Sequence, residues 1–240
     1  MLLTSVSEMQ SVPCPGLGRW LATLLLAVLV AVPVSAQEDP GEIVKRSTDR
    51  IMVLVEEAPA YFDSDPDRYI NAIGAELDSV VDFRGFARGV MGDYASSTRY
   101  RSLDKAGQNK LREQLEAFTQ ALRNGLINTY ARGLLAFGGS TAEIDATDIS
   151  PDSARVASVT QRVNSPEGNT YTIRYQMGQY KDGSWKLRNM IIENINLGEI
   201  YRGQFEAAAA AADGDLDQVI ANWGDPRVDT QIEEGEDGAE

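Results

Sequence analysis

The 240-residue sequence contains no histidine, and its only cysteine is Cys14. Without histidine the chain cannot form a Ser–His–Asp triad, a histidine zinc site or an imidazole general base. The sequence patterns of phosphate-binding loops, dinucleotide-binding loops and nucleophile elbows are also missing. These absences argue against an enzyme. Carboxylate chemistry remains the one open route, with Asp82, Tyr130 or Glu193 as the acid or base.

The N-terminal segment has the pattern of an export signal. Arg19 precedes an apolar run of about 13 residues, and Val34-Ser35-Ala36 follows it with small residues at the two positions that a signal peptidase reads. We therefore expect residues 1–36 to be a cleaved signal peptide. Translation would start at Met1 or Met9. The alternative, a retained membrane anchor, is less favoured because a membrane span needs about 20 apolar residues.

Cleavage after Ala36 would leave a mature chain without cysteine, because Cys14 lies before the apolar run. No disulfide and no metal site built on cysteine or histidine is then expected, and the domain must be stabilised by its hydrophobic core. The whole chain carries 22 Lys and Arg against 36 Asp and Glu, a formal charge of −14. Such a surface repels nucleic acid and anionic lipid headgroups, although solubility alone explains it equally well.

Apolar residues recur at helical spacing through the first half of the mature chain. The predicted helices are 41–57, about 65–80, 83–94 and about 105–137, and the last ends at Gly138-Gly139. From about Glu143 the period changes to two. The predicted strands lie near 155–163, 171–177 and 185–197, joined by turns as an antiparallel meander, and two closing helices follow over about 199–212 and 215–223.

The third predicted strand is irregular. Its apolar residues change phase twice, from Trp185 and Leu187 to Met190 and Ile192 and then to Ile195 and Leu197. This implies one bulge near Arg188–Asn189 and another near Glu193–Asn194, or burial on both faces. Helices followed by a sheet predict an α+β domain over residues 37–224, with N-terminal helices packed on a curved antiparallel sheet. The acidic tail over 225–240 is expected to be disordered.

The chain resembles the MlaC family of periplasmic phospholipid-binding proteins, also called toluene-tolerance or ABC-transporter auxiliary proteins. The resemblance covers about 42–223 and depends on the order and spacing of several short motifs. These are Val81-Asp82-Phe83, Ala87-Arg88, Val90-Met91-Gly92, Thr129-Tyr130-Ala131, Trp185-Lys186, Ile192-Glu193, Tyr201-Arg202-x-x-Phe205 and Gly214-Asp215-Leu216.

The resemblance implies a soluble periplasmic shuttle that is not an enzyme and needs no cofactor, with phospholipid as its cargo. Its expected partners are an outer-membrane lipoprotein complex and an inner-membrane ABC-transporter complex, and its expected role is to maintain the lipid asymmetry of the outer membrane. The acyl chains would lie in an apolar cavity between the sheet and the helices. A sterol-like cargo, or a non-transport assembly module, remains the alternative.

We predict the cavity wall from the apolar faces of the strands and helices. The sheet would contribute Tyr171, Ile173, Tyr175, Met177, Trp185 and Leu187, and the helices Phe83, Val90, Met91, Tyr130, Leu134, Tyr201 and Phe205. Periodicity alone equally allows these residues to fill an ordinary core. Arg88 and Arg202 are the candidates for contact with the headgroup phosphate, with surface ion pairing as the simpler alternative.

Overall fold

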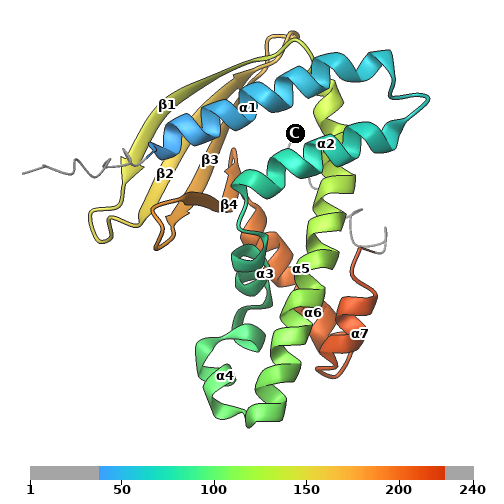
Figure 1. The fold of residues 1–240 in the computed structure, drawn as a ribbon, viewed down its shortest axis with the longest axis vertical. Coiled ribbons are helices and arrows are strands. Elements are labelled where there is room, and N and C mark those ends of the chain that lie inside the picture. Colours follow the sequence, from blue (N-terminus) through green and yellow to red (C-terminus); the bar gives the residue numbers. More distant parts are fainter. Residues whose placement is uncertain (1–37, 225–240) are drawn as a thin grey trace, which may run out of the picture. The chain divides into compact units, whose positions relative to one another are not determined.

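The computed structural model describes residues 38–224. The predicted signal peptide and the predicted acidic tail lie outside the described residues. The α-helices are α1 (Pro40–Glu57), α2 (Pro66–Val80), α3 (Phe83–Met91), α4 (Ser97–Ser102), α5 (Lys105–Leu134), α6 (Leu197–Ala211) and α7 (Leu216–Ala221) (Figure 1). Three 3-10 turns, η1 (Ala58–Ala60), η2 (Gly92–Ala95) and η3 (Leu135–Phe137), follow α1, α3 and α5.

The strands form one antiparallel sheet in which the spatial order repeats the chain order. They are β1 (Thr141–Ile149), β2 (Val156–Asn164), β3 (Thr170–Gln179), β4 (Trp185–Ile192) and β5 (Ile195–Asn196). The predicted α+β class and the meander are confirmed. The prediction of three strands was incomplete, since β1 forms a further edge strand and the last predicted strand divides into β4 and β5.

Each helix begins at a polar side chain that accepts a hydrogen bond from a backbone N–H of the first turn. The capping residues are Asp39, Asp65, Asp82, Ser96, Asp104, Asn196 and Asp215. Such caps satisfy donors that the helix itself leaves unpaired, each worth about 1 kcal/mol. The caps therefore determine where the helices start, in close agreement with the predicted starts.

The predicted bulge near Arg188 is confirmed. Asn189 pairs with Gln176 whereas Leu187 pairs with Met177, so Arg188 is an extra residue in β4. The bulge returns the apolar residues of β4 to a single face of the sheet, which explains the phase change in the sequence. The second predicted bulge was wrong. Ile192 pairs with Ile195, and Glu193 with φ of 53° occupies the tight turn between β4 and β5.

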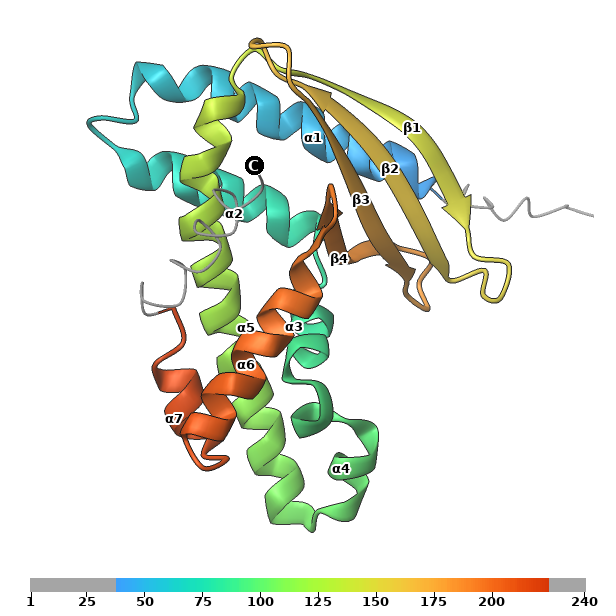
Figure 2. The same cartoon turned by 180° about the vertical axis from the view of Figure 1, so that it is seen from behind.

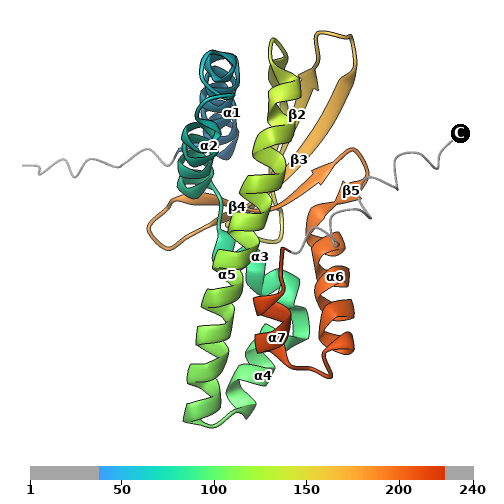
Figure 3. The same ribbon diagram turned by 90° about the vertical axis from the view of Figure 1, so that its right-hand side faces the viewer.

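The buried apolar residues form three clusters. The first joins α3, α5, α6 and α7, and Figure 2 shows α6 beside α3 and α7 beside α5. The second packs α1 on one face of the sheet, which we call the inner face. The third joins α1, α2 and α5. Figure 3 shows α1 and α2 in one layer and strands β2 and β3 in another. The inner face of the sheet therefore contacts the first two clusters, and no described residue of the third cluster lies on a strand.

Candidate functional site

The predicted wall residues divide into two groups by burial. Seven are buried, namely Phe83, Val90, Met91, Met177, Trp185, Tyr201 and Phe205. Six are half-buried, namely Tyr130, Leu134, Tyr171, Ile173, Tyr175 and Leu187. Since a bound acyl chain must cover side chains that the protein itself leaves partly uncovered, the half-buried group is the better candidate for direct contact.

Several of the buried residues belong to the tightly packed helical cluster. The rings of Phe118 and Phe205 lie 4.8 Å apart, and the rings of Tyr94 and Phe205 lie 5.8 Å apart, both edge-on. Val90 and Met91 are at most 1% exposed in the same cluster. These contacts are those of an ordinary core.

The half-buried residues come from the sheet and from α5. Tyr175 packs against the α1–sheet cluster and Leu134 against the α1–α2–α5 cluster. The hydroxyl oxygen of Tyr130 lies 3.3 Å from that of Tyr201 in the helical cluster. Tyr171 stacks edge-on against Phe137 with 5.6 Å between ring centres, which brings η3 to β3. We call Tyr130, Leu134, Tyr171, Ile173 and Tyr175 the inner-face site.

A polar network that the sequence analysis missed crosses the inner face. Tyr175 donates its hydroxyl to Gln161 Oε1 at 2.8 Å, and Gln161 Nε2 donates to Thr48 Oγ1 on α1 at 3.1 Å. Gln161 is only 1% exposed. Burial raises the pKa of the Tyr175 phenol, so the network stays neutral at physiological pH. The sequence signal for this network is Gln161, which occupies one of the alternating positions of β2 that otherwise hold apolar residues.

Two hollows in the surface are formed by described residues. One, of about 660 Å³, lies between α1 and α2, and the other, of about 420 Å³, lies at the end of the sheet near Pro151. Of the predicted wall residues, only Met177 borders either hollow. At the place of the predicted cavity between sheet and helices, the structure has half-buried apolar side chains. The lining of that cavity stays a prediction.

The two arginines predicted to contact the headgroup lie on the surface of the helical half. Arg202 on α6 donates from Nε to the carbonyl oxygen of Gly89 at 3.0 Å, which ties α6 to the last turn of α3. Arg88 is exposed on α3. Arg202 therefore has a structural contact of its own, and the headgroup role of both arginines stays a prediction.

The residues considered as acid or base have structural partners. Asp82 accepts from the Gly85 N–H at 2.8 Å as the cap of α3, and its other oxygen lies 3.4 Å from Arg188 Nε. Burial, followed by the hydrogen bond to Asp82, raises the pKa of Tyr180 beside this pair. Glu193 accepts from the Thr172 N–H. These contacts account for the two carboxylates without catalysis.

Residues 38–224 contain neither a cluster of metal-binding side chains nor a membrane-spanning helix. Nowhere in this range do three acidic, histidine or cysteine side chains come together in a way that could bind a metal ion. No helix within the same range has the length and apolar character needed to cross a membrane. The inner-face site is built from aromatic rings and aliphatic chains, which suit an apolar ligand.

Comparison with known proteins agrees with this arrangement. The sequence profile of the MlaC protein family matches residues 45–225. The toluene tolerance protein ttg2D of Pseudomonas putida is 26% identical over 201 residues, which are 83% of this chain and 87% of that protein. A phospholipid-binding protein of Ralstonia solanacearum, solved in complex with a phospholipid, superimposes with a TM-score of 0.62 at 19% identity. That match covers 78% of this chain and 99% of the other.

Proposed function

Because the chain belongs to the MlaC family, we propose that it binds phospholipid and carries it between membranes. The observation that carries this proposal is the inner-face site, where apolar residues of β3 and α5 remain half-buried. Tyr175 packs against the α1–sheet cluster, and Leu134 packs against the α1–α2–α5 cluster. Acyl chains placed there would complete the packing that these side chains lack.

The energetics of a carrier need no covalent chemistry. Removing one methylene from water is worth about 0.8 kcal/mol, so two chains of about 16 carbons represent roughly 25 kcal/mol. A bilayer offers the same shelter, and a carrier must match it closely enough to exchange lipid in both directions. A site lined by movable aromatic and aliphatic side chains can adapt to chains of different length.

The carrier is proposed to work in the periplasm with no resident cofactor, because the N-terminal segment has an export pattern and the family resemblance implies this compartment. We propose an outer-membrane lipoprotein complex and an inner-membrane ABC-transporter complex as its partners, and maintenance of outer-membrane lipid asymmetry as the result.

The first test is native mass spectrometry of residues 37–240 purified after export in bacteria, followed by identification of the extracted lipid. A mass excess equal to one or two phospholipids would support the proposal. A sterol-like molecule in its place would change the cargo. Protein that purifies without lipid and takes none from vesicles would contradict the carrier function and favour an assembly module.

The same measurement tests the two arginines suggested by the sequence. Loss of lipid from an Arg88→Ala/Arg202→Ala variant that remains folded would support their contact with the headgroup. Unchanged lipid content and unchanged transfer between vesicles would rule out an essential role for either residue.

A further inference from the structure

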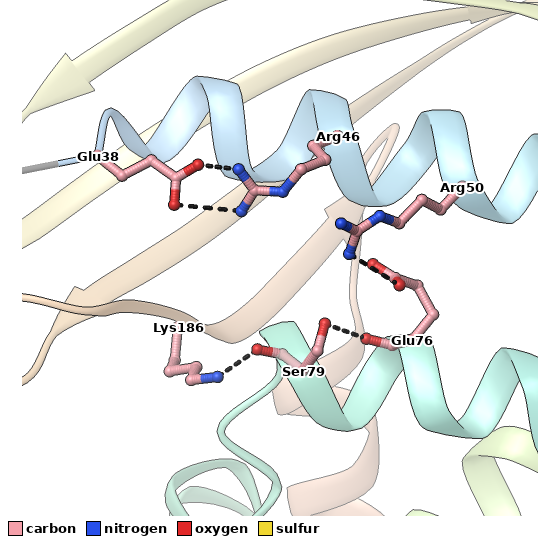
Figure 4. A network of polar contacts seen from close by, with 6 residues as sticks. All are labelled: Glu38, Arg46, Arg50, Glu76, Ser79 and Lys186. Atoms are coloured by element: carbon pink, nitrogen blue, oxygen red, sulfur yellow. Dashed lines mark hydrogen bonds and ion pairs between the residues drawn. The ribbon is translucent and has the colours of Figure 1, made fainter.

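The hollow between α1 and α2 has an apolar floor and a charged rim. Val53 and Leu54 of α1 and two alanines of α2, Ala72 and Ala75, form the floor, and Val53 is 52% exposed. The rim consists of Arg46, Asp49 and Arg50 from α1 and Glu76 from α2. We call this hollow the α1–α2 groove. Both arginines lie on α1. Glu76 of α2 faces Arg50, whereas the guanidinium of Arg46 turns toward Glu38 (Figure 4).

Glu76 has an incomplete set of hydrogen bonds. Its side chain is only 11% exposed, and its Oε2 lies 3.4 Å from Arg50 Nη1, at the long end of an ion pair. Its Oε1 is buried and has no hydrogen-bond partner among the described residues. A buried carboxylate oxygen without a donor is unfavourable. An ammonium group entering the groove would supply the missing donor once the carboxylate turns this oxygen toward the groove.

Arg46 and Arg50 carry positive charge, opposite to that of Glu76. They are four residues apart on α1 and therefore lie on the same face of that helix. Arg50 is 56% exposed, and its contact with Glu76 uses one nitrogen of a guanidinium that has five N–H donors. Arg46 is held by Glu38 through both terminal nitrogens. Lys45 neutralises Asp49 at 2.7 Å. Arg50 is therefore the cation with most capacity for a further anion, and a planar guanidinium suits phosphate oxygens.

The groove thus offers a phosphate-binding side and an ammonium-binding side separated by the width of one ion pair. We propose that Arg50 and Glu76 bind a zwitterionic phosphate–ammonium group, such as the phosphoethanolamine headgroup of a phospholipid. The phosphate binds Arg50, and the ammonium donates to the Glu76 carboxylate. A headgroup with a phosphate but no ammonium provides no hydrogen-bond donor for the Glu76 carboxylate. Its phosphate is also repelled by the negative charge of that carboxylate.

This inference rests on the proposed function and assigns the lipid headgroup a place. Leu54 borders the groove and also packs on the α1–α2–α5 cluster, which includes Leu134 of the inner-face site. Leu54 is therefore the residue that the groove shares with the cluster on which Leu134 packs.

The test offers the lipid-free protein vesicles containing equal amounts of phosphatidylethanolamine and phosphatidylglycerol, and native mass spectrometry then gives the ratio of the two bound lipids. The wild type is expected to favour phosphatidylethanolamine by about three- to tenfold, as for one charge-assisted hydrogen bond in a partly exposed site. Glu76→Gln should bring the ratio close to one, because the amide keeps the shape and loses the charge. Glu113→Gln, on the exposed face of α5, is the matched control.

A second variant separates the two sides of the groove. Arg50→Gln should lower the retention of both lipids by about three- to tenfold and change their ratio little, since both contain a phosphate. Arg112→Gln, an exposed arginine on α5, should behave as the wild type. Thermal unfolding of each variant confirms that it is folded. An unchanged lipid ratio in Glu76→Gln with full lipid occupancy would overturn the inference and leave the carrier function intact.

Failure of the wild type to take up any lipid would instead contradict the proposed function.

A second experiment distinguishes a lipid headgroup from a free soluble ligand. Glycerophosphoethanolamine is titrated into lipid-free protein, and binding is followed by the amide NMR signals of α1 and α2. Shifts that Arg50→Gln and Glu76→Gln abolish, together with a vesicle ratio that responds to Glu76, show that the headgroup alone is recognised. A response confined to vesicles shows that the groove acts on intact lipid. If glycerophosphoethanolamine binds but Glu76→Gln leaves the ratio of the two lipids taken from vesicles unchanged, the assignment of the groove to a lipid headgroup is overturned.

Discussion

The guanidinium of Arg188 lies over Gly178 on the neighbouring strand, in the space that a Cβ at Gly178 would occupy. Arg188 is the extra residue of the β4 bulge, and it pairs with Asp82, the cap of α3. The Asp82 N–H also donates to the carbonyl oxygen of Leu187 at 2.8 Å. Bulge, glycine and helix cap together attach α3 to the sheet.

The first prediction follows from this close approach. Gly178→Ala should lower the free energy of unfolding by about 1 kcal/mol, because the flexible Arg188 side chain must move away and loses its contact with Asp82. Urea denaturation gives the change. In an Arg188→Ala background the same glycine substitution should cost almost nothing. An equal cost in both backgrounds would show that Arg188 is not what Gly178 accommodates.

The second prediction concerns the buried network on the inner face. Gln161→Leu should cost about 2 kcal/mol, because the hydroxyls of Tyr175 and Thr48 lose their buried partner. Adding Tyr175→Phe and Thr48→Val removes the groups left unsatisfied, so the triple variant should recover part of this loss. Denaturant midpoints of the single and triple variants measure the effect. A triple variant less stable than Gln161→Leu would contradict the explanation.

The third prediction is a loss of stability in alkali. Burial raises the pKa of Tyr69 from 10.0 to about 12 and also raises the pKa of Tyr175. The phenols ionise near pH 10 in the unfolded chain and stay neutral in the fold. Their contribution is therefore complete below pH 10 and is lost as the pH rises toward 12, by up to about 1.4 kcal/mol per pH unit for each group.

Tyr69→Phe isolates one of these groups. The Tyr69 hydroxyl has no hydrogen-bond partner within the described part of the chain, so its removal should change stability little at pH 8. Between pH 10 and 11 the variant should lose stability less steeply than the wild type. Unfolding free energies at pH 8, 10 and 11 decide this, and parallel curves for the two proteins would exclude Tyr69 as a source of the alkaline sensitivity.

The fourth prediction separates the two faces of β3. Ile173→Trp places a large ring in the inner-face site, so bound lipid should fall at least threefold while the protein stays folded, because the ring fills space that acyl chains need. Thr172→Trp, one residue earlier on the exposed outer face, should leave lipid content unchanged. Native mass spectrometry measures both. Unfolding of Ile173→Trp would instead identify Ile173 as part of a filled core.

The sequence predicted most helices well because their apolar periods and caps are local signals. It missed α4, which buries no residue and so carries no apolar period. It also missed β1 as a separate strand. The pairing of β1 with β2 shifts between Ile144 and Ala146, so the half-buried positions pass from Ala142 and Ile144 to the polar Thr147. A strand interrupted in this way has too short a regular stretch to be recognised.

The candidate site was harder to predict, for a physical reason. Phe205 and Ile173 are both apolar and both follow the period of their elements, yet Phe205 is fully packed and Ile173 is half-buried. That difference depends on how distant elements pack against each residue and has no local signature. Glu76 and Arg50 look like ordinary solvated charges in the sequence. Only the pairing of α1 with α2 brings them together.

The order of the strands also has a consequence for how the chain folds. Each strand pairs with the one that precedes it, so the sheet needs only local contacts and can grow by adding one hairpin after another. The helical cluster depends on distant contacts, since Arg202 reaches Gly89 across 113 residues. We therefore expect the docking of α6 onto α3 to be the slow, late event. Until it occurs, the newly made chain would expose the aromatic residues of α6 to chaperones and to other chains.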